Sequence, residues 1–227
     1  ILFFSTSSWY FIFMSIFMTL TCHSFADNVQ ERIARVQISS IPFKCIKEAK
    51  FPRPLYAFPN AYLTDLPVYL YSDLALHQTD YDENIDCSIF RRFKVGERGL
   101  DLIAVDLTLS ELSKKVLIVY DQNNCMDCLE VEVCWGVNGI LSVKQWRIDS
   151  NENIIVTWIK VDNATPISAF SDFGSVEGQR IDMYYTVDDS GHFRLDKEVR
   201  YKPQTYTQSY LEDASKELWD GNEVPLD

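Results

Sequence analysis

Four strand-like runs in the middle of the chain, separated by short turns, constrain the fold more than any other feature. Turn-forming residues lie between the runs, most clearly at Asn138-Gly139 and at residues 150–153. Strands joined by such short turns must run antiparallel. The runs cover residues 116–121, 128–135, 140–149 and 154–162.

A second hairpin is indicated nearer the C-terminus. Residues 180–188 alternate, so that one face of the expected strand carries Ile181, Met183, Tyr185 and Val187. The turn Asp189-Ser190-Gly191 follows, and the return strand carries Phe193, Leu195, Val199 and Tyr201. This pattern predicts another antiparallel pair.

Helix signals are short by comparison. Residues 108–111 fit a capping box and predict a helix that extends to about Lys115. Residues 209–212 fit a second capping box, and helical spacing then continues to Trp219, with Gly221 as the expected stop. The predicted fold is therefore mainly β (α+β): an antiparallel meander or a sandwich- or barrel-like sheet with two or three short helices, including a C-terminal one.

The first 26 residues contain no charged side chain, and residues 9–20 form an apolar run of the length typical of a signal-peptide core. The run leads into Ser24-Phe25-Ala26, in which the small residues Ser24 and Ala26 occupy the positions that a signal peptidase reads, and the first charge follows at Asp27. We expect cleavage after Ala26, so that residues 27–227 form a single β-rich domain that is exported to the periplasm or secreted. Two alternatives remain. The first is that residues 1–26 stay attached as an uncleaved membrane anchor, which is the only way in which we expect the protein to contact a membrane. The second is lipidation of Cys22.

Export makes disulfides the expected state of the five cysteines that follow residue 26, which are Cys45, Cys87, Cys125, Cys128 and Cys134. A bridge from Cys125 to Cys128 is feasible because Cys125 lies in a turn-rich segment, which leaves Cys45 to pair with Cys87 or Cys134. Cys128 and Cys134 cannot pair if they lie in one strand, since six strand steps separate them by roughly 20 Å. Thiol exchange and zinc binding are weaker alternatives for the Cys-x-x-Cys spacing.

The charge of the chain excludes one class of partner and suggests another. The 227 residues include 21 basic and 33 acidic side chains, a formal net charge of −12 that repels nucleic acid. Residues 27–53 hold six basic and three acidic side chains, a local +3, so the remaining residues 54–227 carry −15. A basic protein is therefore the expected partner.

Signals for catalysis or for a cofactor are weak. Residues 80–86 alternate oxygen side chains as calcium loops do, but Ile85 and Arg91 replace the glycine and the glutamate that an EF-hand needs, so we expect no metal site. His77 and His192 are the histidines after residue 26, and no nucleophile elbow, zinc-protease motif or phosphate loop is present. We expect no cofactor and favour a protein that is not an enzyme. Trp135, Trp146 and Trp158 each fall in a predicted strand, where core packing is the usual role.

These observations favour an exported, non-enzymatic binding protein, most concretely an inhibitor or immunity-type protein that occludes a basic envelope-attacking enzyme. A secreted hydrolase or carbohydrate-binding module and a structural component of the envelope are the alternatives. The expected contact regions are the acidic loop, with Asp80, Asp82, Glu83 and Asp86, and the C-terminal segment, with Glu212, Asp213, Glu217 and Asp220.

Overall fold

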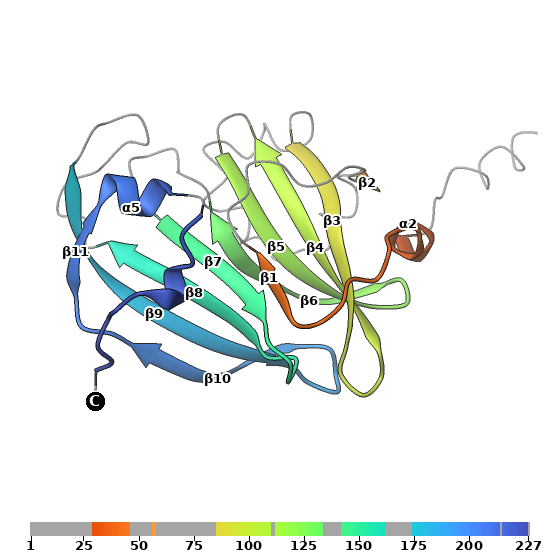
Figure 1. The fold of residues 1–227 in the computed structure, drawn as a ribbon. Coiled ribbons are helices and arrows are strands. Elements are labelled where there is room, and N and C mark those ends of the chain that lie inside the picture. Colours follow the sequence, from red (N-terminus) through yellow and green to blue (C-terminus); the bar gives the residue numbers. More distant parts are fainter. Residues whose placement is uncertain are drawn as a thin grey trace, which may run out of the picture.

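The computed structural model describes residues 29–45, 56–57, 85–109, 112–133, 142–161, 174–213 and 215–226. Within these residues the chain is mainly antiparallel β, with a few short helices, as the sequence predicts. Figure 1 shows two sheets whose strands cross at an angle, with α2 (Val29–Arg35) on one side and the C-terminal elements on the other. The described helices contain no segment that is long and apolar enough to cross a membrane.

The first sheet, sheet A, is a meander in which each strand pairs with the next along the chain. Its order is β2 (Tyr56–Ala57), β3 (Ile85–Val95), β4 (Leu100–Leu109), β5 (Leu112–Asp121) and β6 (Asn124–Val133). Every pairing is antiparallel, and β-bulges interrupt the register between β3 and β4 and between β5 and β6. The sequence analysis assigned neither β3 nor β4.

The second sheet, sheet B, repeats the meander. Its order is β1 (Phe43–Cys45), β7 (Ser142–Ile148), β8 (Ile154–Val161), β9 (Ser175–Val187) and β10 (Phe193–Arg200), and β11 (Gln204–Thr207) pairs with the first part of β9. The hairpin predicted around residues 189–191 is present, with Gly191 at φ 86° in its turn.

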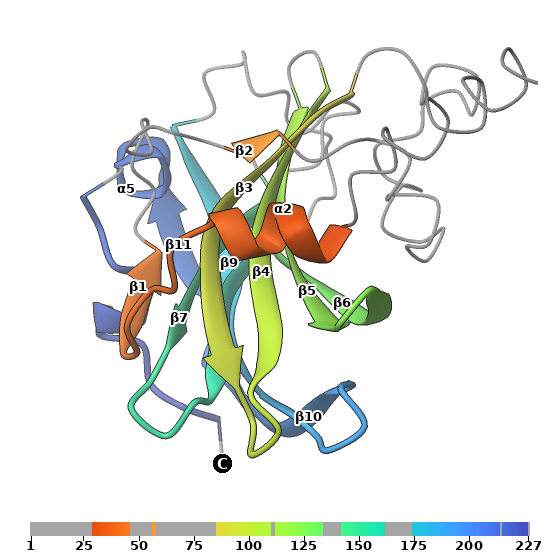
Figure 2. The same ribbon diagram turned by 90° about the vertical axis from the view of Figure 1, so that its right-hand side faces the viewer.

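The main core lies between the two sheets. Sheet A contributes Phe93, Leu102 and Leu117, and sheet B contributes Trp146 and Val156, all of them at 0% exposure. Trp146 therefore has the core role expected of it, Trp158 is partly exposed, and Trp135 lies outside the described residues. The outer face of sheet A is also covered, since α2 lies across it in Figure 2 and buries Ile33 completely.

The helix predicted from Thr108 to Lys115 is wrong. Those residues end β4 and begin β5, and the two strands pair from Leu109 with Leu112 to Asp101 with Tyr120. Ser110 and Glu111, the second half of the expected capping box, lie outside the described residues. A long antiparallel ladder between apolar strands outweighs a local helix-start signal.

The C-terminal helix is shorter than predicted and is broken in two. The α-helix α5 (Gln208–Glu212) has Thr207 as its N-cap, and a 3₁₀ helix, η2 (Leu218–Asp220), follows. Between them Asp213 accepts hydrogen bonds from the backbone N and the Oγ of Ser215. Such a local turn competes with helix continuation, which explains the interruption.

The cysteines are arranged differently from the prediction. β6 begins at Asn124 and so includes both Cys125 and Cys128, which were expected on either side of a turn. The structure joins none of the described Cys45, Cys125 and Cys128 to one another, and an extended strand separates Cα atoms three residues apart by roughly 10 Å, beyond disulfide reach. The side chain of Cys87 in β3, and the whole of Cys134, lie outside the described residues.

Candidate functional site

A cavity of about 710 Å³ lies between the C-terminal segment and the end of sheet B. One wall comes from β11 and α5, and the other from residues 215–226, which we call the strap. Apart from Lys216, the charged residues that line the cavity are acidic. The lining residues are Gln204, Thr205, Tyr206, Thr207, Tyr210, Ser215, Lys216, Glu217, Asp220, Gly221, Asn222 and Glu223.

The first wall is positioned by local signals in the sequence. β11 pairs with β9 from Gln204 to Thr207, and Thr207 then caps α5 by accepting a hydrogen bond from the backbone N of Tyr210. This turn places Tyr206 and Tyr210 together, with ring centroids 5.8 Å apart. Leu211 of α5 is buried in a second apolar cluster, on the outer face of sheet B, with Val143, Ile159 and Leu218.

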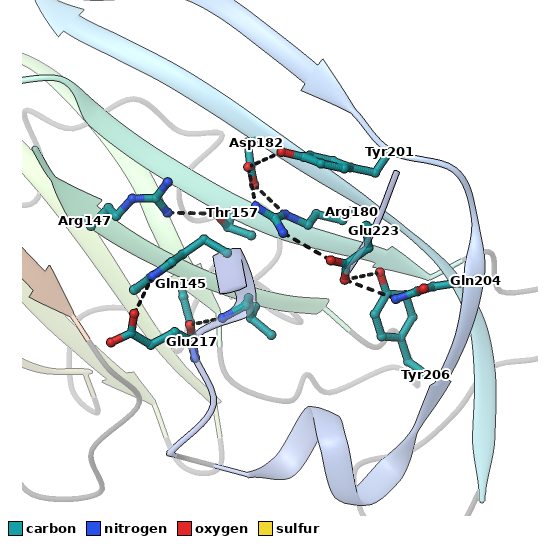
Figure 3. A network of polar contacts seen from close by, with 12 residues as sticks. Gln145, Arg147, Thr157, Arg180, Asp182, Tyr201, Gln204, Tyr206, Glu217 and Glu223 are labelled. Carbon is teal, nitrogen blue, oxygen red and sulfur yellow. Dashed lines mark hydrogen bonds and ion pairs between the residues drawn. The ribbon is translucent and has the colours of Figure 1, made fainter. Parts of the chain in front are cut away.

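Glu223 fixes the far end of the strap through three hydrogen-bond partners, shown in Figure 3. Its carboxylate accepts from Arg180 Nη1 at 3.2 Å, from Gln204 Nε2 at 3.1 Å and from Tyr206 Oη at 3.1 Å. The side chain of Glu223 is fully buried, and that of Arg180 is 5% exposed. A buried carboxylate needs such partners, because its desolvation costs several kcal/mol.

Arg180 is shared between the strap and β9 itself. Its guanidinium donates to both carboxylate oxygens of Asp182, at 3.1 and 2.7 Å, and lies 4.3 Å from the ring centroid of Tyr201. Burial alone would lower the pKa of Arg180, but the hydrogen bonds and the charge of Asp182 raise it above its ordinary value. Arg180 is therefore a permanent cation that holds one carboxylate of the sheet and one of the strap.

The near end of the strap is held by cations around Trp219. The indole ring lies 4.6 Å from the Arg147 guanidinium and 5.7 Å from Lys44 Nζ, both measured to the ring centroid. Glu217 accepts from Lys44 Nζ at 2.7 Å and from Trp219 Nε1 at 2.6 Å. These two donors hold the pKa of Glu217 below its ordinary value, although partial burial opposes them, so Glu217 is ionised at neutral pH.

Gln145 connects the strap backbone to β7. Its amide donates to the carbonyl of Lys216 at 2.7 Å and accepts from the backbone N of Leu218 at 2.9 Å. Gln145 is 2% exposed and Leu218 is 1% exposed. The strap is therefore also fixed to sheet B by Gln145, at the same end as the contacts of Glu217 and Trp219.

The chemistry of the cavity suits binding better than catalysis. Burial and the charge of Glu223 raise the pKa values of Tyr206 and Tyr210, so both phenols remain neutral hydrogen-bonding groups at pH 7. Three carboxylates face one ammonium group in the lining, and no histidine or cysteine is among the described lining residues. The described lining therefore offers no imidazole or thiol, whereas its carboxylates and phenol rings can hold a cationic group.

The structure brings together two of the acidic residues predicted from the sequence. Glu217 and Asp220 both line the cavity. Asp213 instead makes the turn with Ser215, whose hydrogen bonds hold the pKa of Asp213 below its ordinary value. Glu212 ends α5, but its side chain lies outside the described residues.

The acidic loop predicted as a second contact region falls largely outside the part of the chain that the structure describes. Asp80, Asp82 and Glu83 lie outside the described residues, as does His77. Asp86 pairs with Thr108 in the β3–β4 ladder, and its side chain is not described. Among the described residues, no three or more His, Cys, Asp or Glu side chains are grouped as a metal ion would need.

His192 lies away from the cavity. It occupies the turn between β9 and β10, and its Nδ1 is 3.8 Å from a carboxylate oxygen of Asp127. The imidazole is 54% exposed. A contact of this length between exposed groups is weak in water, and it lies between the turn and β6 of sheet A.

The most heavily bonded residues of the site were not found from the sequence. Arg180, Asp182 and Gln145 all lie on the outer face of sheet B, whereas the sequence analysis followed the apolar residues of the opposite face. An available signal was the pair Arg180 and Asp182, which two-residue spacing places on one face of a strand. Glu223, the partner of Arg180 on the strap, is 43 residues away in sequence, which no local pattern reveals.

Comparison with known proteins does not assign the chain to a family. No protein-family model matches it, and neither a curated protein nor a solved structure matches it significantly.

Proposed function

We propose that the chain is an exported, non-catalytic binding protein that recognises a basic partner protein and acts by occluding it. The observation that carries this proposal is the cavity beneath the strap, which has three carboxylates and two neutral tyrosines in its lining. Carboxylates with aromatic rings suit a lysine or arginine side chain, which gains both ion pairing and cation–π contact.

Charge supports the proposal at longer range. The formal net charge of −12 accelerates encounter with a basic protein and orients it. Within the cavity, Glu217 and Glu223 already pair with Lys44 and Arg180, whereas Asp220 is exposed. Asp220 is therefore the carboxylate best placed to meet an incoming cation.

The test is affinity capture from cell-envelope extract, followed by titration calorimetry with the captured protein after purification. We expect a basic protein to bind at low salt and to be released at high salt.

Asp220→Asn should weaken binding about fivefold, since an accessible ion pair contributes about 1 kcal/mol. Asp189→Asn, in the exposed turn between β9 and β10, is the matched control and should bind as the wild type does. Failure to recover any basic protein at low salt contradicts the proposal.

A carbohydrate-binding module or secreted hydrolase is the second candidate, because Tyr210 and the amides of Gln204 and Asn222 also line the cavity. An aromatic ring beside amide donors and acceptors is a common way to hold a sugar. A glycan array combined with an activity screen on peptidoglycan and esters separates the two candidates. Binding of a glycan at high salt, or turnover, favours the second candidate.

A further inference from the structure

The two faces of β7 and β8 are both buried, and the outer face carries Val143 and Ile159 of the second apolar cluster but also buries polar side chains. The inner face packs Trp146, Ile148, Ile154 and Val156 into the main core. The outer face, near the strap, instead buries Gln145 and Thr157, at 2% and 0% exposure. On the neighbouring β9 this polar strip continues with Arg180 and Asp182, at 4% and 1%. A covering segment that served stability alone would find apolar residues there more favourable.

The strap itself is held mainly by polar contacts. Among the described residues 215–226, Leu218 is the one apolar side chain that is buried, while Val224 and Leu226 are 56% and 44% exposed. The last part of the strap is fixed by two backbone hydrogen bonds, from Lys202 N to Val224 O and from Leu226 N to Arg200 O. A segment with so little buried apolar surface has a low free energy of local opening.

We propose that the strap opens as a unit while both sheets remain folded, and that it is the movable wall of the cavity. The chain can pivot at the Asp213–Ser215 turn, where α5 has ended and η2 has not begun. Residues 215–217 and 220–223 form one side of the cavity, so opening widens it and uncovers the polar strip of sheet B. The opening does not depend on the proposed function, whereas its role in admitting a cation of the partner rests on that function.

Glu223 is the residue whose hydrogen bonds hold the far end of the strap closed. Three partners on two strands converge on its carboxylate: Arg180 on β9, and Gln204 and Tyr206 on β11. When the strap opens, Arg180 keeps both hydrogen bonds to Asp182 and so remains paired. The hydrogen bonds of Glu223 can therefore break without leaving Arg180 as an isolated buried charge.

Hydrogen exchange measured by mass spectrometry on the full chain tests the opening. We expect amides of residues 216–226 to exchange at least tenfold faster than amides of β7 and β8. Glu223→Gln should speed exchange in the strap by a further tenfold or more and leave the two sheets unchanged. Glu198→Gln is the matched control, because Glu198 pairs only with Arg200 on the exposed strand β10 among the described residues, and it should change neither region.

Two results would overturn the inference: equal exchange in the strap and the sheets of the wild type, or a Glu223→Gln variant in which both regions accelerate together. If Glu223→Gln does not fold, Lys44→Ala replaces it, since Lys44 is 53% exposed and holds the near end of the strap through Glu217. That variant should accelerate the strap alone, by a smaller factor. The exchange measurement uses no partner protein. A strap that stays closed therefore contradicts the opening but not the binding proposal, and failure to capture a basic protein contradicts the binding proposal but not the opening.

Discussion

Two buried arginines in this protein, Arg92 and Arg180, are each held by a carboxylate that comes from a different element. On sheet A, Arg92 of β3 donates from Nε to Asp101 of β4 at 2.7 Å, and Gln30 of α2 donates to the other oxygen of Asp101 at 3.0 Å. On sheet B, Arg180 joins β9 to the strap in the same way. Asp101 thereby connects α2 to sheet A through Gln30, and Glu223 connects the strap to sheet B through Arg180, so both carboxylates help to position a peripheral segment.

Asp101 should make stability depend on pH. Burial raises the pKa of its carboxyl, but hydrogen bonds from Arg92, Gln30 and Lys94 outweigh burial and hold that pKa below its ordinary value. Asp101→Asn should therefore lower the free energy of unfolding by about 3 kcal/mol at pH 7, because it leaves Arg92 buried without its carboxylate. Urea unfolding of both proteins measures the difference.

The sign of the pH effect follows from the lowered pKa. A carboxylate of this kind contributes its stability fully above about pH 4, the ordinary range of an unfolded aspartate, and loses it as pH falls through the lower folded pKa. The gap between the wild type and Asp101→Asn should accordingly narrow from pH 4 to about pH 2. A gap that stays constant over that range would show that Asp101 acts through packing rather than through charge.

Gly221 is required by the position of Glu223. Its φ of −69° is open to any residue, so backbone strain is not the reason for a glycine there. A Cβ at this position would collide with the Glu223 carboxylate, which cannot move cheaply because three partners hold it. Gly221→Ala should cost about 1–3 kcal/mol of strap stability, measured as faster hydrogen exchange in residues 216–226. Unchanged exchange would contradict the close packing at Glu223.

At the level of elements, the sequence was most informative where one face of a strand is apolar and a turn follows. The β9–β10 hairpin satisfies both conditions, and its pairing from Phe193 with Val187 to Arg200 with Ile181 agrees with the predicted antiparallel pair. β4 does not meet the first condition. Its residues Leu102, Ile103, Ala104 and Val105 are all buried, so apolar side chains occupy both faces of the strand and do not alternate with polar ones. A strand buried on both faces cannot be distinguished from a helix segment by periodicity.

The candidate site was predictable only in part for a related reason. The sequence indicated an acidic C-terminal segment, and Glu217 and Asp220 do line the cavity. Acidity alone could not distinguish Asp213, which makes a local turn, from Glu223, which is buried against Arg180. That distinction depends on contacts between residues about 40 apart, which the fold creates and no local pattern contains.

The start of α5 provides a direct comparison of the predicted and observed caps. The sequence suggested Ser209 as the first residue of a capping box, whereas the structure has Thr207 Oγ1 accepting from Tyr210 N at 3.2 Å. Thr207→Ala should therefore destabilise α5 by about 1 kcal/mol, and Ser209→Ala by less than about 0.5 kcal/mol. Hydrogen exchange of residues 208–212 reports both values, and a larger effect from Ser209→Ala would restore the original assignment.

The whole molecule is a series of four layers: α2, sheet A, sheet B and the strap with α5 (Figures 1 and 2). The layers are not held equally. Apolar side chains fill the space between the sheets, Ile33 at 0% exposure fixes α2, and polar networks fix the strap. We therefore expect the strap to open most easily, and the two sheets to unfold last.

The position of α2 bears on the cleavage proposed after Ala26. α2 begins at Val29, the third residue of a chain cleaved there, and it supplies both Ile33 and the Gln30 hydrogen bond to Asp101. A protein that begins at Asp27 keeps α2 and these contacts, so it should melt within about 2 °C of the 227-residue chain, a shift that corresponds to about 0.5 kcal/mol or less.

A protein that begins at Val36 is the matched control, because it lacks α2. Loss of Ile33 alone should cost about 3 kcal/mol, or roughly 6–12 °C in a chain of this size. Calorimetry on the two truncated proteins measures both shifts, and the intact mass of protein secreted by a bacterial host tests cleavage itself, with Asp27 expected as the first residue. If the protein beginning at Asp27 melted several degrees below the full chain, residues 1–26 would belong to the folded domain, and the proposed cleavage after Ala26 would have to be abandoned.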